Sequence, residues 1–496
     1  MTTIHRRSAI HGLCAGMLAL CLLSTENSSA AEPPRDLACA AYAFDTPLTE
    51  LRLKERVLPP CAESVTQSAA DFPNHNRFTT LQHGFDMYSW LLFAALNSPR
   101  DPNGRFGAAQ PTMWESYKLI DDVMLPGGAA PDPNYDAPHK VPAVCPAPTP
   151  DKPTSLVVHM TTEAFNQPFR TGPLIDQSGN YSLNVILMNR VMFDAIVNHD
   201  HPLYSKAGQQ HFSGDVNFIP GVNGTEPKTI TPQQGSVPGS QLGAVMVKVS
   251  WKLLTDKDDE RRFHHIWAYR HFPAGVFNGD TRAETCDIVK LGMVGFHVGH
   301  KTVTRNQWIW TTFEHVDNAP TRTDLKALSL LPPEKRPAFN FFNAACTDER
   351  QCGFNDTPPQ AWDPRHPNVT FRSQIVRTNP ILGDAKNLTD AVHALPQIKG
   401  TEWEHYELVS TQWPSDFGCA GDVKPGNQPD PSCAPAPPLL ANTTLETYSQ
   451  HDIGGSGTAQ STSSCIGCHN NATTQHLPAT ASDFTFILEK AQGRTN

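Results

Sequence analysis

Apolar and polar residues follow distinct patterns along the chain, and each pattern predicts a kind of element. In GAVMVKVSWKLLT they alternate, with Val245, Val247 and Val249 on one side and Lys248 and Ser250 on the other. A period of two is typical of a strand with one buried face. The stretches IVKLGMVGFHVGHK and NQWIWTTFEHV are rich in β-branched and aromatic residues, so we expect strands there too.

Other stretches lack this alternation and favour helices. Apolar residues cluster in FDMYSWLLFAALNSP, which predicts a helix ending between Asn97 and Pro99. NRVMFDAIVNHDH predicts a second helix, and SDFTFILEKAQ predicts a short helix capped by Ser482 or Asp483. We therefore expect an α+β fold, with an antiparallel sheet or sandwich in the middle and a mainly helical segment last.

Two proline-rich stretches interrupt these elements. The sequence has 44 prolines and 32 glycines, and residues 125–154 and 423–438 are dense in proline and other turn-forming residues. Such stretches are poor in apolar periodicity and are typical of loops or linkers. They divide the chain into an N-terminal helical segment, a β-rich domain and a final segment: 31–124, 155–422 and 439–496.

The first thirty residues have the layout of an export signal. Arg6 and Arg7 precede a short apolar run, and Ser28 and Ala30 offer small side chains for cleavage. The run is shorter than the roughly 18–20 apolar residues that a bilayer span needs. We expect residues 1–30 to be a signal peptide, the protein to be periplasmic or secreted, and no stable membrane span.

The charge of the chain narrows the class of partner. The formal net charge is −10, and Lys and Arg do not form a basic stripe. Nucleic-acid binding needs positive charge to neutralise phosphates. We therefore expect no nucleic-acid partner.

Cysteine usage also fits an oxidising compartment. Of twelve cysteines, two lie in the leader and two in the motif CIGCH, which leaves an even number, eight. Nearest-neighbour pairing suggests these disulfides: Cys39–Cys61, Cys346–Cys352, Cys419–Cys433 and, as the remaining pair, Cys145–Cys286. The sequence does not fix the pairing, because eight cysteines allow about 105 arrangements.

The motif CIGCH, residues 465–469, carries the most specific chemistry. Two thiols separated by two residues can add to the two vinyl groups of a haem, and a histidine directly after them can reach the iron. A redox dithiol or half of a zinc site are the alternatives. No second CxxC completes a zinc site. We expect one covalent haem c, with Cys465 and Cys468 as anchors and His469 as the proximal iron ligand.

The sequence leaves the other side of the iron open. Only 27 residues follow His469, none of them methionine, and the last methionine is Met293. The sixth ligand therefore comes from the upstream domain, or the position is open. GFHVGHK offers His297 and His300 as candidates, with Met293 next, and alternation places His297 on the strand face of Leu291 and Met293.

Beyond the motif, three stretches are informative because they carry a resemblance to known proteins: MYSWLLFAALNSP, GFHVGHKTVTRNQWIWTTFEHVDN and LLANTTLETYSQ. With CIGCH, they resemble the large exported bacterial proteins of the cytochrome c family that carry a single CxxCH. The resemblance implies a periplasmic haem protein and no settled reaction. It carries over only the roles of Cys465, Cys468 and His469.

Two functions remain open. One is electron transfer through a single haem to a periplasmic redox partner protein. The other is a haem-dependent oxidoreductase, peroxidase- or oxygenase-like, with an open iron position and polar groups such as Arg270, His271 or Arg305 nearby. Trp308 and Trp310 share a strand face and could line a haem edge, although core packing is the commoner role. The histidines of the middle domain could also bind another metal, but their spacing is not specific.

Overall fold

The computed structural model describes most of the chain after residue 74. The described residues are 75–100, 111–165, 167–212, 216–219, 243–276, 281–302, 305–359, 362–363, 365, 370–414, 434–450 and 463–493. The predicted leader and the pairs Cys39–Cys61 and Cys419–Cys433 lie outside these residues.

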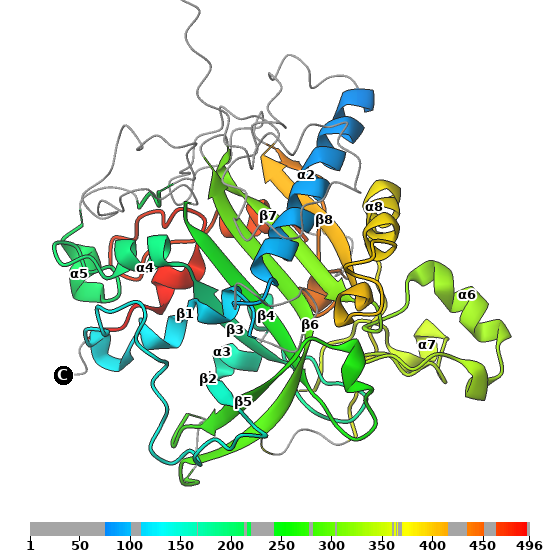
Figure 1. Ribbon diagram of the computed structural model, residues 1–496, viewed down its shortest axis with the longest axis horizontal. Coiled ribbons are helices and arrows are strands. Elements are labelled where there is room, and N and C mark those ends of the chain that lie inside the picture. The colour runs from blue at the N-terminus through cyan, green and yellow to red at the C-terminus, as the bar shows by residue number, and fades with distance from the viewer. Residues whose placement is uncertain are drawn as a thin grey trace, which may run out of the picture.

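One large sheet organises the described chain (Figure 1). Its strands are β1 (Lys118–Leu119), β2 (Thr154–His159), β3 (Leu183–Met188), β4 (Val245–Leu253), β5 (His265–Phe272), β6 (Thr285–Thr302), β7 (Arg305–His315), β8 (Tyr406–Pro414) and β9 (Pro435–Ala436). They are ordered β1-β3-β4-β6-β7-β8-β9, while β5 pairs with the first half of β6 and β2 pairs with β5. Only the β2–β5 pair is parallel among these strands. The α+β class with a mainly antiparallel sheet is confirmed, as one sheet and not a sandwich.

The helices are short apart from the first. They are α2 (His75–Leu96), α3 (Thr162–Phe165), α4 (Arg190–Ile196), α5 (Lys206–Gln210), α6 (Arg322–Leu330), α7 (Glu349–Cys352), α8 (Gly383–His393) and α10 (Cys465–His469). Helices α2 and α4 occur where the sequence predicts them. No helix of the described residues is long and apolar enough to cross a membrane.

The sheet has two faces with different coverings. We call the side of Val247, Phe296 and Phe313 the α2 face, because these residues share one core with α2 and α8. Figure 1 shows α2 lying across β7 and β8. Nearly every described side chain of α2 from residue 82 onward is buried, which explains why its apolar residues show no helical stripe.

The opposite side is the hook face, defined by Lys248, His297 and Thr312, which pair across β4, β6 and β7. Residues 439–450 and the C-terminal segment 463–493 cover it, together with α4 and α5. In Figure 1 this segment, in red, lies beside α4 and α5. Both the CIGCH motif and the last described turns therefore lie on one side of the sheet.

A bulge on β6 decides which histidine reaches which face. Trp251 pairs with Met293 but its neighbour Ser250 pairs with Gly295, so Val294 is an extra residue on β6. An extra residue reverses the alternation of side chains beyond it, because side chains in a strand repeat every two residues.

This bulge makes one sequence expectation wrong. His297 does not share the face of Leu291 and Met293: those two lie in the core on the α2 face, and His297 lies on the hook face. His300, three residues further on, faces α2. Periodicity alone could not reveal this, because the bulge depends on the partner strand.

The end of the chain is less helical than expected. In residues 463–493 the regular elements are α10 and a 3-10 helix, Phe486–Lys490, whose cap is Thr485 and not Ser482 or Asp483. A mainly helical final segment is therefore not confirmed. The remaining residues form turns that pack against the sheet, α4 and α5.

Two of the expected disulfides are present. Cys145 is joined to Cys286, with their Cα atoms 4.7 Å apart, and Cys346 to Cys352, with Cα atoms 6.2 Å apart. These two pairings are confirmed. Cys465 and Cys468 are not joined to each other.

Candidate haem-attachment site

The CIGCH motif forms α10, a single turn fixed to the edge of the sheet. Ser464 caps it: its hydroxyl accepts a hydrogen bond from the Gly467 amide (3.1 Å) and donates one to Oε1 of Gln412 on β8 (3.2 Å). The same Gln412 oxygen accepts a hydrogen bond from the amide of Ile466 (2.8 Å), whose side chain is buried. The cap and the contact with β8 hold the turn in place, although α10 has only five residues.

Both thiols of the motif are held in the neutral form. Burial raises the pKa of Cys465 well above its usual value, and the nearby carboxyl of Glu446 adds to the effect. For Cys468, burial and then Glu446 raise the pKa to about 11. Redox dithiols depend on a lowered thiol pKa that produces the thiolate nucleophile. The environment of this pair is therefore unlike that of a disulfide-exchange site.

The ring of His469 is fixed in one tautomer. Its Nδ1 lies 2.8 Å from the carbonyl oxygen of Phe484, and because a carbonyl only accepts, Nδ1 carries the proton. The ring packs on Trp310 (4.2 Å between centroids) and Phe486 (5.0 Å). Burial lowers the pKa of His469 to about 4, so the ring is neutral at physiological pH. Nε2 is then the nitrogen with a lone pair for a metal.

His297 lies close to this ring on the hook face. Burial lowers its pKa well below the usual value, and the neighbouring Lys248 and His469 lower it further. Its Nε2 is 3.3 Å from Oε2 of Glu446 but is not aligned for a hydrogen bond, and it has no hydrogen-bond partner among the residues that the structure describes. A buried imidazole nitrogen without a partner is unusual and fits a ligand position.

Sequence reasoning missed Glu446. The carboxyl accepts a hydrogen bond from the Asn442 amide (3.1 Å), and burial raises its pKa to about 7, although Lys248 acts in the opposite direction. Asn442 in turn donates to Thr312 Oγ1 (3.0 Å) and to the Phe313 carbonyl (2.8 Å) of β7. The only sequence signal was that Glu446 lies in LLANTTLETYSQ, one of the stretches that carried the resemblance.

The other proposed distal ligands lie elsewhere. His300 is buried on the α2 face, where its Nδ1 is hydrogen-bonded to the Tyr88 hydroxyl. Met293 is buried in the core of the same face. The sheet therefore separates both from His469, and His297 alone of the three shares its face.

The remaining polar candidates have other partners. Arg270 is paired with Asp287 (2.6 Å), and His271 contacts Glu284 (2.6 Å) at the far end of β5. Arg305 lies over the Phe85 ring on the α2 face (5.3 Å). Across the described parts of the chain, no three His, Cys, Asp or Glu side chains are arranged to bind a metal ion directly.

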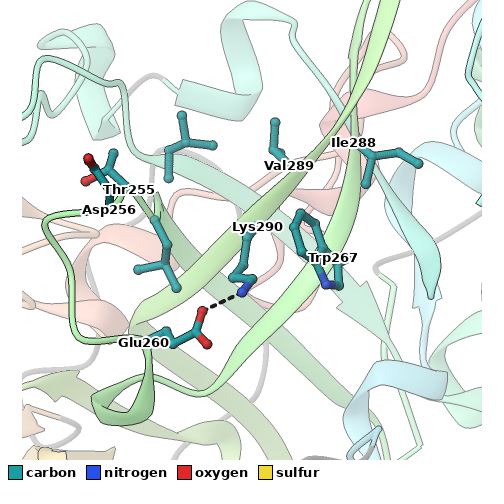
Figure 2. A pocket seen from close by; sticks show the side chains of 9 residues that line it. Thr255, Asp256, Glu260, Trp267, Ile288, Val289 and Lys290 are labelled. Carbon is teal, nitrogen blue, oxygen red and sulfur yellow. Dashed lines mark hydrogen bonds and ion pairs between the residues drawn. The ribbon is translucent and has the colours of Figure 1, made fainter. Parts of the chain in front are cut away.

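An open groove of about 430 Å³ lies at the junction of β4, β5 and β6 (Figure 2). Its wall includes Trp267 and the aliphatic side chains of Ile288 and Val289, and an ion pair joins Lys290 to Glu260 at its rim. The lining residues do not include the CIGCH motif or His297. It is a surface feature separate from the candidate site.

Comparison with known proteins adds no neighbour: no family model, no curated protein and no solved structure matches this chain. The resemblance to cytochrome c family proteins therefore stays a prediction. The case for haem rests on the residues of the site.

The residues of the site fit a covalently attached haem. Two unpaired neutral thiols lie on one capped turn, and the next residue presents an unprotonated Nε2. A second neutral imidazole, that of His297, lies on the same face of the sheet, and its Nε2 has no hydrogen-bond partner in the described parts of the chain. Cys465, Cys468 and His469 would hold the haem, and His297 lies on the same face of the sheet as His469.

Proposed function

We propose that this chain is a periplasmic c-type haem protein that transfers electrons through one haem attached to Cys465 and Cys468. The observation that carries the proposal is the state of the motif: His469 has its Nδ1 committed to the Phe484 carbonyl, next to two neutral, unpaired thiols. When bound, the haem iron supplies a one-electron redox couple.

The neutral thiols suit the attachment chemistry. Each Cys S–H adds across one vinyl double bond, with sulfur bonding to one carbon and hydrogen to the other. No electrons are gained or lost, so attachment needs no oxidant. It does need both cysteines reduced, and the structure holds them unjoined.

We propose His297 as the second histidine that would bind the haem iron. Its support is an Nε2 without a hydrogen-bond partner among the described residues, the neutral ring and the closeness to His469 that lowers its pKa. A bis-histidine pair gives a lower reduction potential than a histidine–methionine pair. The proposed partner is therefore a periplasmic redox protein of correspondingly low potential.

One observation favours the alternative, a haem-dependent oxidoreductase with an open iron position. His297 and Glu446 lie 3.3 Å apart, and the pKa of Glu446 is raised to about 7, mainly by burial. A neutral imidazole beside a carboxyl that titrates near neutrality is suited to general acid–base chemistry. In this reading His297 does not bind the iron and instead handles protons beside it.

Export to the periplasm is part of the proposal. The residues that predict it, 1–30, lie outside the described chain. Support comes from the disulfides Cys145–Cys286 and Cys346–Cys352, because such bonds persist mainly in oxidising compartments.

Extraction with acidified organic solvent tests the covalent bond. We expect the purified protein to keep its haem colour in the protein fraction, the Cys465→Ser/Cys468→Ser variant to lose it, and single variants to keep one thioether. The Cys346→Ser/Cys352→Ser variant is the matched control, because it removes two cysteines distant from the motif and should retain the colour. Wild-type protein that releases its haem, or never contains any, would show that the proposal is wrong.

Carbon monoxide separates the two functions. A six-coordinate carrier gives a low-spin spectrum that carbon monoxide does not change, and His297→Ala should then open the iron and allow the gas to bind. Wild-type protein that already binds carbon monoxide would favour the oxidoreductase. His300→Ala is the control and should leave the spectrum unchanged in either case.

A further inference from the structure

The carbonyl that fixes His469 belongs to a strained turn. Asp483 and Phe484 both have positive φ angles, 53° and 60°. Residues other than glycine rarely adopt this left-handed conformation, and a bulky residue such as phenylalanine does so least readily. Two in succession persist only where neighbouring contacts hold them.

A buried ion pair provides that hold. Lys301 Nζ, at the end of β6, lies 2.6 Å from Asp483 Oδ2, and the two side chains are 1% and 0% exposed. The same oxygen accepts a hydrogen bond from the Phe218 amide (2.7 Å), and Lys301 also bonds to Asn217. The carboxylate of Asp483 is therefore tied to the sheet and to a second segment at once.

The other end of the turn is tied to the segment that follows α10. The Ser482 amide donates to the Ala472 carbonyl (3.2 Å), and the Ser482 hydroxyl donates to the Thr485 carbonyl (2.7 Å). Phe484 lies between these bonds, and its carbonyl accepts the proton of His469 Nδ1. Asp483 of the ion pair is therefore the residue directly before the one whose carbonyl is hydrogen-bonded to His469.

Trp308 reinforces the arrangement from β7. Trp308 also has a positive φ angle, 67°, and it lies against the Asp483 carboxylate. Its ring is 6.3 Å from the ring of Trp310, and Trp310 packs on His469. Backbone strain concentrated around one histidine is typical of a functional constraint.

We propose that the buried Lys301–Asp483 ion pair is a positioning element for His469: it holds the Phe484 carbonyl against Nδ1 and so determines which ring nitrogen is presented to haem and how basic that nitrogen is. The inference rests on the proposed function for the identity of the bound group. Hydrogen bonding at the second nitrogen of a metal-ligating histidine raises its strength as a ligand. Loss of the ion pair should therefore weaken that hydrogen bond and destabilise the oxidised iron.

Reduction potentials of three variants test the mechanism. Lys301→Met, Asp483→Asn and the double variant should all raise the midpoint potential, because each frees the carbonyl from Nδ1. If only the charge mattered, Lys301→Met would lower the midpoint potential and Asp483→Asn would raise it. The double variant would then stay near the wild-type potential. Opposite shifts in the two single variants, or no shift at all, would overturn the proposal.

Each single variant leaves one charge buried without its partner, which can prevent folding. The double variant removes both charges and therefore avoids this problem. Lys252→Met is the matched control: Lys252 is a buried lysine paired with Asp258 (2.5 Å) but takes no part in the turn. It should weaken the fold without moving the potential. Lys301→Arg keeps the charge and should largely restore wild-type behaviour.

A second measurement needs no haem. Nitrogen-15 NMR of histidine-labelled Cys465→Ser/Cys468→Ser protein should show His469 protonated at Nδ1, and Asp483→Asn in that background should shift the population toward the Nε2-protonated form. Should the protein contain no covalent haem, the proposed function fails while this measurement still decides the positioning role. A haem-loaded protein with His469 unaffected by the variants would disprove the positioning role alone.

Discussion

His297 and His300 stand three residues apart on β6, yet the sheet separates them into different environments. On the α2 face, His300 is fully buried and hydrogen-bonded to Tyr88, beside a core of packed aromatic rings. On the hook face, the Nε2 of His297 has no hydrogen-bond partner among the described residues and lies close to Glu446 and His469.

The two faces of the sheet are covered in different ways. The α2 face places apolar side chains against a helix that is buried nearly all round. The hook face is covered by irregular segments held through side-chain hydrogen bonds, such as those of Asn442 to β7. Irregular backbone on a rigid scaffold often carries binding and catalytic residues, because it can bring side chains from distant segments together.

Truncating Phe93 should give the largest loss of stability. Phe93 is 1% exposed and its ring contacts Phe296, Phe313 and Trp403 on the α2 face. Phe93→Ala leaves a cavity there and should lower the free energy of unfolding by about 3–5 kcal/mol. Urea denaturation measures this loss. Phe486→Ala, beside His469, should cost less stability but change the haem spectrum; the reverse pattern would contradict the division between the faces.

Glu446 should make stability fall as pH rises. Its pKa moves from an ordinary value of 4.5 to about 7, mainly because of burial, so the folded state keeps a proton that the unfolded state has lost. Between about pH 4.5 and 7 the free energy of unfolding should therefore drop by about 3 kcal/mol relative to Glu446→Gln, at about 1.4 kcal/mol per pKa unit. Urea titrations across this range, in the Cys465→Ser/Cys468→Ser background, measure the slope.

Asp86 provides the counterpart on the α2 face. Burial also raises its pKa to about 7, and its Oδ1 accepts hydrogen bonds from the Thr411 amide (2.9 Å) and from Gln82 (3.0 Å). Asp86→Asn should flatten the pH dependence in the same way but leave the haem spectrum unchanged, while Glu446→Gln alters both. If the free energy of unfolding depends on pH in the same way in wild type and in Glu446→Gln, Glu446 does not cause the pH dependence.

The two histidines of β6 should separate stability from spectrum. His300→Ala removes an imidazole hydrogen-bonded inside the core and should cost about 1–3 kcal/mol of unfolding free energy. His297→Ala, at a partly exposed site, should cost less and should convert the haem from low to high spin. Urea denaturation and absorption spectra on both variants give the comparison, and a spectral change in His300→Ala would count against it.

The sequence predicts the elements that follow a strict pattern. The alternation around Val247 and the apolar cluster of α2 locate a strand and a helix correctly, and the spacing of Cys465, Cys468 and His469 defines the candidate motif. These signals are local, so they survive without knowledge of the fold.

What the sequence misses depends on contacts between distant residues. The bulge at Val294 exists only in the pairing of β6 with β4, and it reverses the face of His297. Lys301 and Asp483 are 182 positions apart. Glu446 lies beside His297 because Asn442 and Thr443 tie its segment to β7. No periodicity or motif carries such information.

Ser464 should show the smallest effect on stability and a clear effect on attachment. It caps α10 through the Gly467 amide, and loss of a cap costs about 1 kcal/mol. Because α10 has only five residues and is fixed by this cap and by Gln412, Ser464→Ala should loosen the spacing of the two thiols and lower the yield of covalent haem. Thr321→Ala removes the cap of α6, where Thr321 accepts from the Asp324 amide (3.2 Å), at a similar cost in stability. The haem-to-protein ratio of the two variants decides the point: equal ratios would mean that the rigidity of the hook-face turn does not matter for attachment, and a deficit confined to Ser464→Ala would mean that it does.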